Sequence, residues 1–196
     1  MKSIKLIRKL IRKTLIIIGI KKEPITTQIQ KYGGKIGKGV FIGSGVVVDF
    51  DFGFLLEIED GAVIASNSII ELHDSSLSNI LGHGVLKVGK VIIKKRAYIG
   101  VSSTILPGVV IGECALVGAN SLVNKSIPNG EVWAGVPIRY ICKVSELDEK
   151  RKLEDNHPLC FNVDYVGEEE KLTIDYPKYK EQKILEIKKH FRRRKL

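Results

Sequence analysis

Two histidines lie in a polar stretch of roughly twenty residues, 71 to 90, that interrupts a more regular sequence. His73 stands between Glu71 and Asp74, and His83 stands between two glycines. An imidazole has an ordinary pKa near 6.5, so it is largely neutral at neutral pH and can accept a proton from an attacking hydroxyl. A neighbouring carboxylate, Asp74 or Glu71, could orient the ring and hold its tautomer. The stretch therefore carries candidates for general-base catalysis.

A second polar cluster lies in the sequence DFDFGFLLE, residues 49 to 57. It combines three phenylalanines with Asp49 and Asp51, whose carboxylates could hydrogen-bond the hydroxyls of an acceptor. Short polar runs are also typical of solvated turns, so both interpretations stay open at this point. In either case we expect the chain to bulge here or to point a side chain into a cleft.

The scaffold that must position these residues has a period of six. From residue 93 to 128 an aliphatic residue returns at every sixth position, in the series Ile93, Ile99, Ile105, Ile111, Val117 and Val123. Small residues tend to stand four places after each, as in Ala97, Ser103, Val109, Ala115 and Ser121. Six fits neither a helix nor a single strand, so it describes a repeat unit. Turning a corner every six residues closes a triangular coil in about eighteen, and stacked coils predict a β-solenoid.

The same step begins earlier and is broken twice. It runs from Ile36 to Val48, slips over residues 49 to 57, resumes from Ile58 to Ile70, and stops again until about Lys90. A break of this length inside a solenoid must leave the stack as a loop, and loops on a rigid scaffold often carry function. We therefore expect residues 72 to 90 to project from the coils.

The most regular stretch resembles a known family. The sequence ILPGVVIGECALVGANSLVNKSIP, followed by VWAGVPIRYI, is similar to the end of the repeat domain in the hexapeptide-repeat acyltransferase superfamily. The resemblance implies a left-handed parallel β-helix, a homotrimer, and acetyl-CoA as the acyl donor. The handedness comes from the resemblance alone, because right-handed crossovers are the rule for parallel strands.

The resemblance also assigns a catalytic base. Many sugar-modifying members carry a His-Asp pair just after a coil strand, followed by a projecting loop, and its histidine is the base. His73 and Asp74 match this pair, and His83 is the rival base or an acceptor contact. In that family the acceptor attacks acetyl-CoA directly, so no serine or cysteine nucleophile is needed.

The donor site follows from the resemblance as well. Gly118, Ala119 and Ser121 stand where the family has Gly-Ala-Gly-Ser beside the pantetheine arm, with Asn120 in place of the second glycine. Two further candidates, Asn124 and Lys125, match a Thr/Ser-Lys pair near the nucleotide, where a lysine could meet a phosphate. Arg139 is a second candidate cation. An ordinary solvated charge explains either cation equally well.

The charge lies mainly at the two ends of the chain. The formal net charge is +10, residues 1 to 22 hold eight Lys or Arg and no acid, and residues 188 to 195 hold six more Lys or Arg. Aliphatic residues at helical spacing between residues 4 and 18 predict a basic amphipathic helix. This helix could contact an anionic membrane surface or pack on the coils. The nearly neutral remainder argues against a nucleic-acid partner.

No stretch is long enough to span a membrane, since the longest aliphatic run covers only residues 15 to 20. No small-residue cleavage site follows that run, so we expect a cytoplasmic protein, with the helix as a contact to the membrane surface. The predicted organisation is a helix over residues 1 to 23, the β-helix over 30 to 141, and a charged extension over 142 to 196. That extension holds a helix at about 172 to 191 and is expected to cap the coils.

Taken together, the residues and the resemblance predict an acetyl-CoA-dependent O-acetyltransferase acting on a sugar hydroxyl in surface polysaccharide or glycoconjugate synthesis. The first alternative is an enzyme of the same architecture that acetylates a different acceptor, namely an amino sugar, serine or an antibiotic. A non-catalytic β-helix scaffold is the alternative of another class. The metal-dependent carbonic anhydrase branch needs three histidine ligands, and only His73 and His83 lie near the coils, so no metal is predicted.

Overall fold

The computed structural model describes Thr14 and residues 23 to 153. The predicted amphipathic helix over residues 1 to 23 lies almost entirely outside the described residues, although Thr14 is helical and exposed. The predicted helix at about 172 to 191 lies outside them as well. In the described part, no helix is both long and apolar enough to cross a bilayer.

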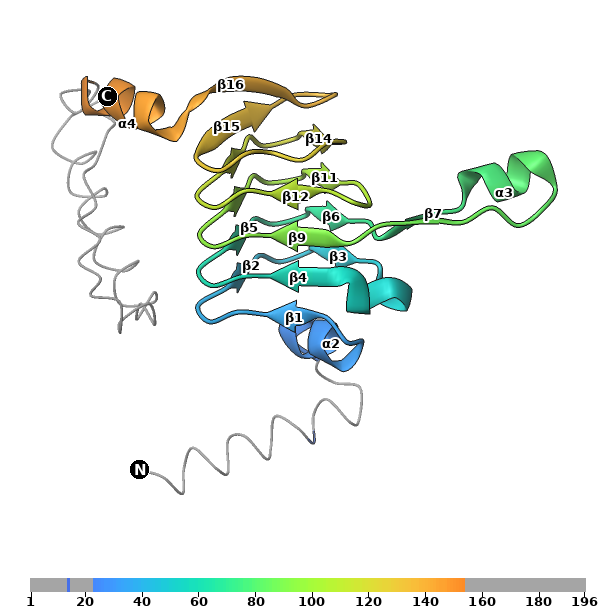
Figure 1. The fold of residues 1–196 in the computed structure, drawn as a ribbon. Helices are drawn as coiled ribbons and strands as arrows, with labels where there is room; N and C mark the ends of the chain where they lie inside the picture. The colour runs from blue at the N-terminus through green and yellow to red at the C-terminus, as the bar shows by residue number, and fades with distance from the viewer. Residues whose placement is uncertain (1–13, 15–22, 154–196) are drawn as a thin grey trace, which may run out of the picture. The chain divides into compact units, whose positions relative to one another are not determined.

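Short parallel strands form three sheets that run along a stack of coils (Figure 1). Sheet A contains β1 (Lys35–Ile36), β4 (Leu56–Ile58), β9 (Val91–Ile93) and β12 (Val110–Ile111). Sheet B contains β2 (Phe41–Ile42), β5 (Val63–Ile64), β10 (Tyr98–Ile99), β13 (Leu116–Val117) and β15 (Glu131–Ala134). Sheet C contains β3 (Val47–Val48), β6 (Ile69–Ile70), β11 (Thr104–Ile105) and β14 (Leu122–Val123). The strands visit the sheets in the order A, B, C, so three strands make one coil.

The core is a set of aliphatic ladders, one on each sheet. In sheet A, Ile36 pairs with Ile58, Ile58 with Ile93, and Ile93 with Ile111. All six residues of the regular stretch have no exposed surface, namely Ile93, Ile99, Ile105, Ile111, Val117 and Val123. Burying each such side chain stabilises the fold by about 1.5–3 kcal/mol. The six-residue spacing thus identifies the inward face of the coils.

The corners use the left-handed backbone region. The residue three places after an inward aliphatic has φ between 53° and 86° at ten positions: Gly39, Gly45, Gly61, Asn67, Arg96, Ser102, Gly108, Cys114, Asn120 and Gly130. Glycine and asparagine tolerate this conformation best, and here it falls at equivalent points of successive coils. Asn120 is one of these corner residues (φ 55°), so asparagine in place of glycine preserves the turn.

Buried serines complete three of the corners. Ser68, Ser103 and Ser121 are at most 2% exposed. The Ser68 hydroxyl donates to the carbonyl of Ala65 at 2.9 Å, and the Ser121 hydroxyl donates to the carbonyl of Gly118 at 2.7 Å. These contacts satisfy hydroxyls that would otherwise be costly to bury. The positions at which the sequence predicts small residues therefore lie at the corners of the coils.

Both ends of the described stack are covered. Helix α2 (Ile25–Lys31) begins after Pro24 and buries Ile29 against the first coil. Pro24 is the N-cap residue of α2, a position that suits a residue without an N–H to donate. At the other end, β16 (Arg139–Lys143) pairs antiparallel with β15 and covers the edge of sheet B. Helix α4 (Val144–Leu153) follows.

Two inserts leave the coils from sheet C. The short insert begins with Asp49, directly after β3, and continues as η1 (Phe50–Leu55), a 3-10 segment with a kink at Phe52. The long insert follows β6 and forms an arm made of β7 (His73–Asp74), α3 (Ser76–Leu81) and β8 (Lys87–Val88). Strands β7 and β8 pair antiparallel, and the arm projects from the stack (Figure 1).

Candidate active site

The register of sheet C brings the two inserts together. Val48, at the end of β3, pairs with Ile70, at the end of β6, so both inserts begin at the same corner of adjacent coils. Asp49 is the first residue after β3, and His73 opens the arm. A carboxylate oxygen of Asp49, Oδ2, accepts a hydrogen bond from Nδ1 of His73. The side chains are 15% and 33% exposed respectively, which makes the pair accessible without being fully solvated.

The electrostatic surroundings of His73 make it a stronger base. The hydrogen bond to Asp49 raises the pKa of His73, and the negative charges of Asp49, Asp51 and Glu71 raise it further, against a smaller opposing effect of burial. With Nδ1–H donated to Asp49, the proton-free nitrogen is Nε2. The pair can therefore take a proton from a substrate at Nε2 while Asp49 stabilises the resulting imidazolium.

The imidazole is also held by an aromatic contact. The ring of Phe52, on η1, lies with its centroid 4.8 Å from that of His73, at an interplanar angle of 39°. Both Asp49 and Phe52 thus reach His73 from the short insert. A ring that is held both at one edge and on one face loses little further freedom when it reacts.

A cavity of about 530 Å³ lies beside this pair. Its polar lining comes from Asp49, Glu71, His73, Asp74, Ser75 and Ser76, and its apolar lining comes from Val47, Val48, Ile69 and Ile70. The volume suits a small molecule, and four titratable side chains line it. This combination makes the corner a candidate active site.

The structure corrects the predicted partner of His73. We expected Asp74 or Glu71 to orient the ring, whereas the contacting carboxylate is Asp49, which we had placed among the acceptor contacts. The carboxylate of Asp74 instead accepts the backbone N–H of Ser76 at 2.9 Å, and this bond lowers the pKa of Asp74. Asp74 therefore holds the turn into α3, and sequence adjacency to His73 was a misleading signal.

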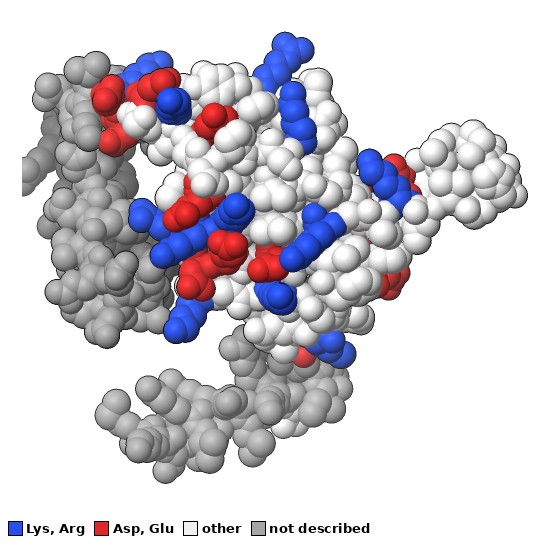
Figure 2. All heavy atoms as spheres, viewed as in Figure 1, with Lys and Arg blue, Asp and Glu red and all other residues white. Residues whose placement is uncertain are grey.

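Two other candidates lie apart from the pair. His83 is exposed in the outer part of the arm, after the left-handed Gly82. Figure 2 shows charged side chains at the base of the arm and none over its α3 end. Asp51 is exposed on η1, near enough for its charge to act on His73.

The predicted donor site splits into buried and exposed parts. The Ser121 hydroxyl also accepts the N–H of Gly135 at 3.1 Å, and the N–H of Gly118 donates to the carbonyl of Trp133 at 2.8 Å. A Cβ on Gly118 would come within 2.7 Å of the Cβ of Ala134, so glycine is needed for the coils to pack. Ser121 and Gly118 thus have structural partners, whereas Ala119 is exposed and free to be approached.

The candidate nucleotide contacts are exposed on the last coils. Asn124, Lys125 and Arg139 all face solvent. The Lys125 ammonium lies 5.3 Å from the ring centroid of Trp133, within the range of a cation–π contact. Trp133 is itself anchored, since its indole N–H donates to Glu131 at 2.7 Å. This contact gives Lys125 a preferred position near β15.

Among solved structures, this chain is similar to that of a point mutant of AntD, an N-acyltransferase from Bacillus cereus, in complex with dTDP and coenzyme A. The TM-score is 0.51 and the sequence identity 30%, over 62% of this chain and 71% of AntD. This chain belongs to the hexapeptide-repeat acyltransferases of the left-handed β-helix type. No family model matches it.

Curated proteins that are similar to this chain differ in the reactions for which they are named. YvoF of Bacillus subtilis (strain 168), named as an acetyltransferase, is 33% identical over 60% of this chain. The galactoside O-acetyltransferase of Escherichia coli (strain K12) is 29% identical over 61% of it. The mitochondrial gamma carbonic anhydrase 1 of Arabidopsis thaliana is 32% identical over 57% of it. The chain spans 65%, 61% and 44% of these proteins respectively.

The carbonic anhydrase likeness raises the question of a metal. Among residues 23 to 153, no group of three or more His, Cys, Asp and Glu side chains is arranged to hold a metal ion. At His73, Nδ1 has a carboxylate partner in Asp49.

Proposed function

We propose that this protein is an acetyl-CoA-dependent O-acetyltransferase that transfers an acetyl group to a sugar hydroxyl, with His73 as the general base. The observation that carries the proposal is the hydrogen bond between His73 and Asp49 at the wall of the 530 Å³ cavity. A base for an alcohol must be oriented and must have one proton-free nitrogen, and this pair provides both.

In the proposed reaction, Nε2 of His73 takes the proton of the acceptor hydroxyl as its oxygen attacks the thioester carbonyl carbon. Asp49 accepts the Nδ1–H throughout and stabilises the imidazolium that forms. When the carbon–sulfur bond breaks, the imidazolium returns the proton to the departing thiolate. The products are an ester and free CoA, and the chain needs no covalent intermediate.

The donor would lie along the coils beside Ala119, with Lys125 and Arg139 near the nucleotide phosphates. Support comes from the exposure of these three residues and from the similarity to AntD, whose structure contains coenzyme A. Gly118 and Ser121 belong to this site as packing residues, since their polar groups are engaged within the coils. Asn124 remains a candidate contact through its exposed amide.

The proposal extends to assembly and location. A homotrimer, formed by side-to-side contact of coils, would bring a neighbouring copy close to the cavity. The outward faces of the sheets support this, since Phe41, Val47 and Tyr98 are between 43% and 56% exposed. We place the protein in the cytoplasm, in surface polysaccharide or glycoconjugate synthesis, with residues 1 to 22 as a contact to anionic membrane surfaces.

An amine acceptor is the second candidate. The similarity to AntD, an N-acyltransferase, covers 71% of that protein, whereas the similarity to the galactoside O-acetyltransferase covers 61% of the latter. A protonated amine must also lose a proton before it attacks, so the same pair of His73 and Asp49 would serve. The two reactions differ in the product, which is an ester or an amide.

One screen tests both candidates. The purified full chain is incubated with acetyl-CoA and a panel of sugars, amino sugars, nucleotide sugars, serine and an aminoglycoside, and free CoA is measured. Products are then separated from acetyl-CoA and treated with alkaline hydroxylamine, which cleaves acetyl esters and leaves amides intact. Sugar-dependent CoA release with a hydroxylamine-sensitive product supports the proposal. A resistant product selects the amine acceptor, and no CoA release with any acceptor overturns the proposed function.

A further inference from the structure

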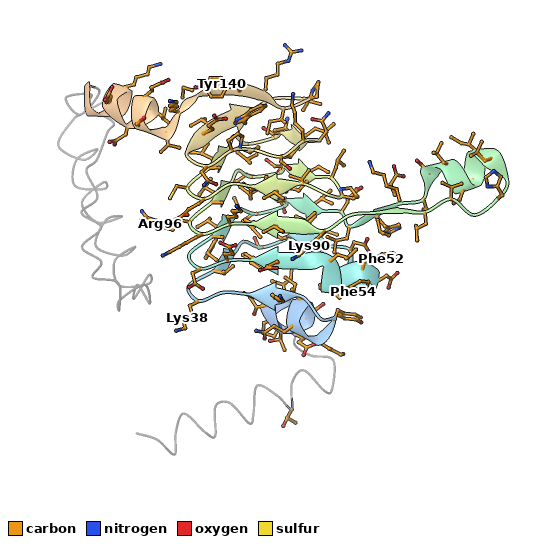
Figure 3. The ribbon with its side chains drawn as sticks, viewed as in Figure 1. Lys38, Phe52, Phe54, Lys90, Arg96 and Tyr140 are labelled. Carbon is orange, nitrogen blue, oxygen red and sulfur yellow. The ribbon has the colours of Figure 1, made fainter. Side chains whose placement is uncertain are left out.

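An aromatic shelf stands next to the catalytic pair, and its exposed member, Phe54, has no role in the chemistry described so far. It consists of Phe52 and Phe54 on η1, whose ring centroids are 6.5 Å apart, and Phe52 is the ring that contacts His73. Phe54 is 62% exposed, more than the outward-facing aromatic side chains of Phe41 and Tyr98. Figure 3 labels both residues of the shelf, on η1 near the base of the arm.

The stem of Phe54 is packed even though its ring is exposed. A Cβ added to Gly33 would lie 3.0 Å from the Cβ of Phe54, so the backbone of Gly33 approaches the base of this side chain closely. Gly53, which is buried, packs in the same way against Tyr32, where an added Cβ would lie 2.8 Å from the Cβ of Tyr32. The ring of Tyr32 in turn packs on the ring of Phe50, with the two centroids 5.3 Å apart. The shelf is therefore built on a close-packed base.

A polar group accompanies the shelf. Asp51 lies between Phe50 and Phe52 in the sequence, is exposed, and acts electrostatically on His73. An exposed aromatic ring and an exposed carboxylate on the same short insert offer the two kinds of contact that a sugar ring makes. The C–H groups of a pyranose pack against the electron-rich face of an aromatic ring, and its hydroxyls donate to carboxylate oxygens.

From this arrangement we infer that the aromatic shelf binds the acceptor, as a pyranose whose C–H face packs on Phe54 while one hydroxyl meets Nε2 of His73. This inference rests on the proposed function and specifies its substrate class. Asp51 accepts a hydrogen bond from a neighbouring hydroxyl of the same ring. Phe54 is thus a specificity-determining residue, and the short insert both orients the base and binds the sugar.

The shelf has two other conceivable occupants, which the test must separate. The pantetheine arm of the donor is one, since it also presents methylene groups to an apolar surface. A neighbouring copy of the chain is the other, since an exposed phenylalanine can be an interface residue. A donor contact would change the KM for acetyl-CoA, whereas an interface contact would change the oligomeric state.

The experiment compares Phe54→Leu, Phe54→Ala and Phe54→Trp with the wild type and with Tyr140→Leu, a matched loss of an exposed aromatic ring on β16. The probes are methyl β-D-galactopyranoside and methyl β-D-glucopyranoside, with CoA release as the readout. We expect Phe54→Ala to raise the KM for the accepted sugar roughly tenfold, with kcat and the KM for acetyl-CoA unchanged within about twofold. The sugar KM of Phe54→Leu should lie between those of the wild type and Phe54→Ala, that of Phe54→Trp should match the wild type, and Tyr140→Leu should leave the sugar KM unchanged.

A second measurement does not depend on turnover. In saturation-transfer NMR with the His73→Ala protein, irradiation of the aromatic protons should saturate the ring C–H protons of the bound sugar. Adding Phe54→Leu should weaken this transfer. Sugars that are acetylated with an unchanged KM in Phe54→Ala would overturn the shelf assignment and leave the proposed function standing, as would a raised KM for acetyl-CoA or a lost oligomer. Absence of CoA release with any sugar would overturn both.

Discussion

The two inserts leave the same corner of adjacent coils, yet they are built in opposite ways. The short insert is compact, since Gly53 is buried and η1 packs against α2. The arm buries none of the residues of α3, and Leu77, Ile80, Leu81 and Leu86 are each more than half exposed. The base stands at the start of the arm, but its partners Asp49 and Phe52 come from the short insert. The comparison indicates that a rigid insert positions the base, while the arm remains available for other contacts.

The largest expected effect separates the two histidines of the long insert. Replacing His73 by Ala should lower kcat by roughly a hundredfold or more, because the base acts in the transition state. Replacing His83 by Ala should change kcat far less, since His83 lies in the exposed outer arm. Both variants are assayed for CoA release and checked by light scattering. An active His73→Ala protein beside an inactive His83→Ala protein would reverse the assignment.

A pair of glycine substitutions tests the difference in rigidity directly. Gly53→Ala places a Cβ 2.8 Å from the Cβ of Tyr32, whereas Gly84→Ala in the arm meets nothing within 4 Å. We expect Gly53→Ala to destabilise the fold by about 1–3 kcal/mol through overpacking and to lower the melting temperature by several degrees. Gly84→Ala is the matched control and should melt like the wild type. Equal melting temperatures for the two variants would show that the short insert is not tightly packed.

Substitutions of the candidate donor contacts, which lie outside both inserts, should affect only the binding of acetyl-CoA. Neutralising Lys125 or Arg139 with Gln should raise the KM for acetyl-CoA a few-fold and leave kcat unchanged, because a contact to the remote nucleotide is uniform between ground and transition states. Steady-state kinetics with acetyl-CoA and with its form lacking the 3′-phosphate identify the group that is bound. A loss of affinity that is the same for both donors would show that neither cation binds that phosphate.

The sequence predicts the coils and only part of the site. Ile93 to Val123 recur at every sixth position because each coil repeats one local geometry, so simple counting locates the core. The same six-residue count places Asn120 at a corner of the coils, where its backbone is left-handed. The pair of Asp49 and His73 could not be found this way, because the two residues lie 24 positions apart on inserts that interrupt the repeat. A usable signal was present, since Val48 and Ile70 each end a run of hexads, which aligns the starts of the two inserts.

The predicted partner of His73 was wrong because the prediction relied on adjacency in the sequence. Asp74 follows His73 directly, but the side chains of neighbouring strand residues point to opposite sides, and the Asp74 carboxylate holds the Ser76 N–H instead. The Phe52 contact was also out of reach, because it depends on the conformation of η1. The described residues end at 153, so the predicted helices over residues 1 to 23 and at about 172 to 191 stay predictions.

The central claim is that Asp49 on the short insert orients and strengthens the base on the arm. Its most direct test is the pH dependence of kcat/KM for the wild type, Asp49→Ala and Asp49→Asn. Activity requires neutral His73, so it rises with pH through the pKa of that residue. Asp49 raises the pKa of His73 above its ordinary 6.5, so removing the carboxylate should move the acidic limb to lower pH and reduce the plateau. The kcat/KM of Asp49→Asn should be no higher than that of Asp49→Ala, because the asparagine amide can donate to Nδ1 and leave the proton on Nε2. An acidic limb that stays at the same pH, with an undiminished plateau, in both variants would contradict the account.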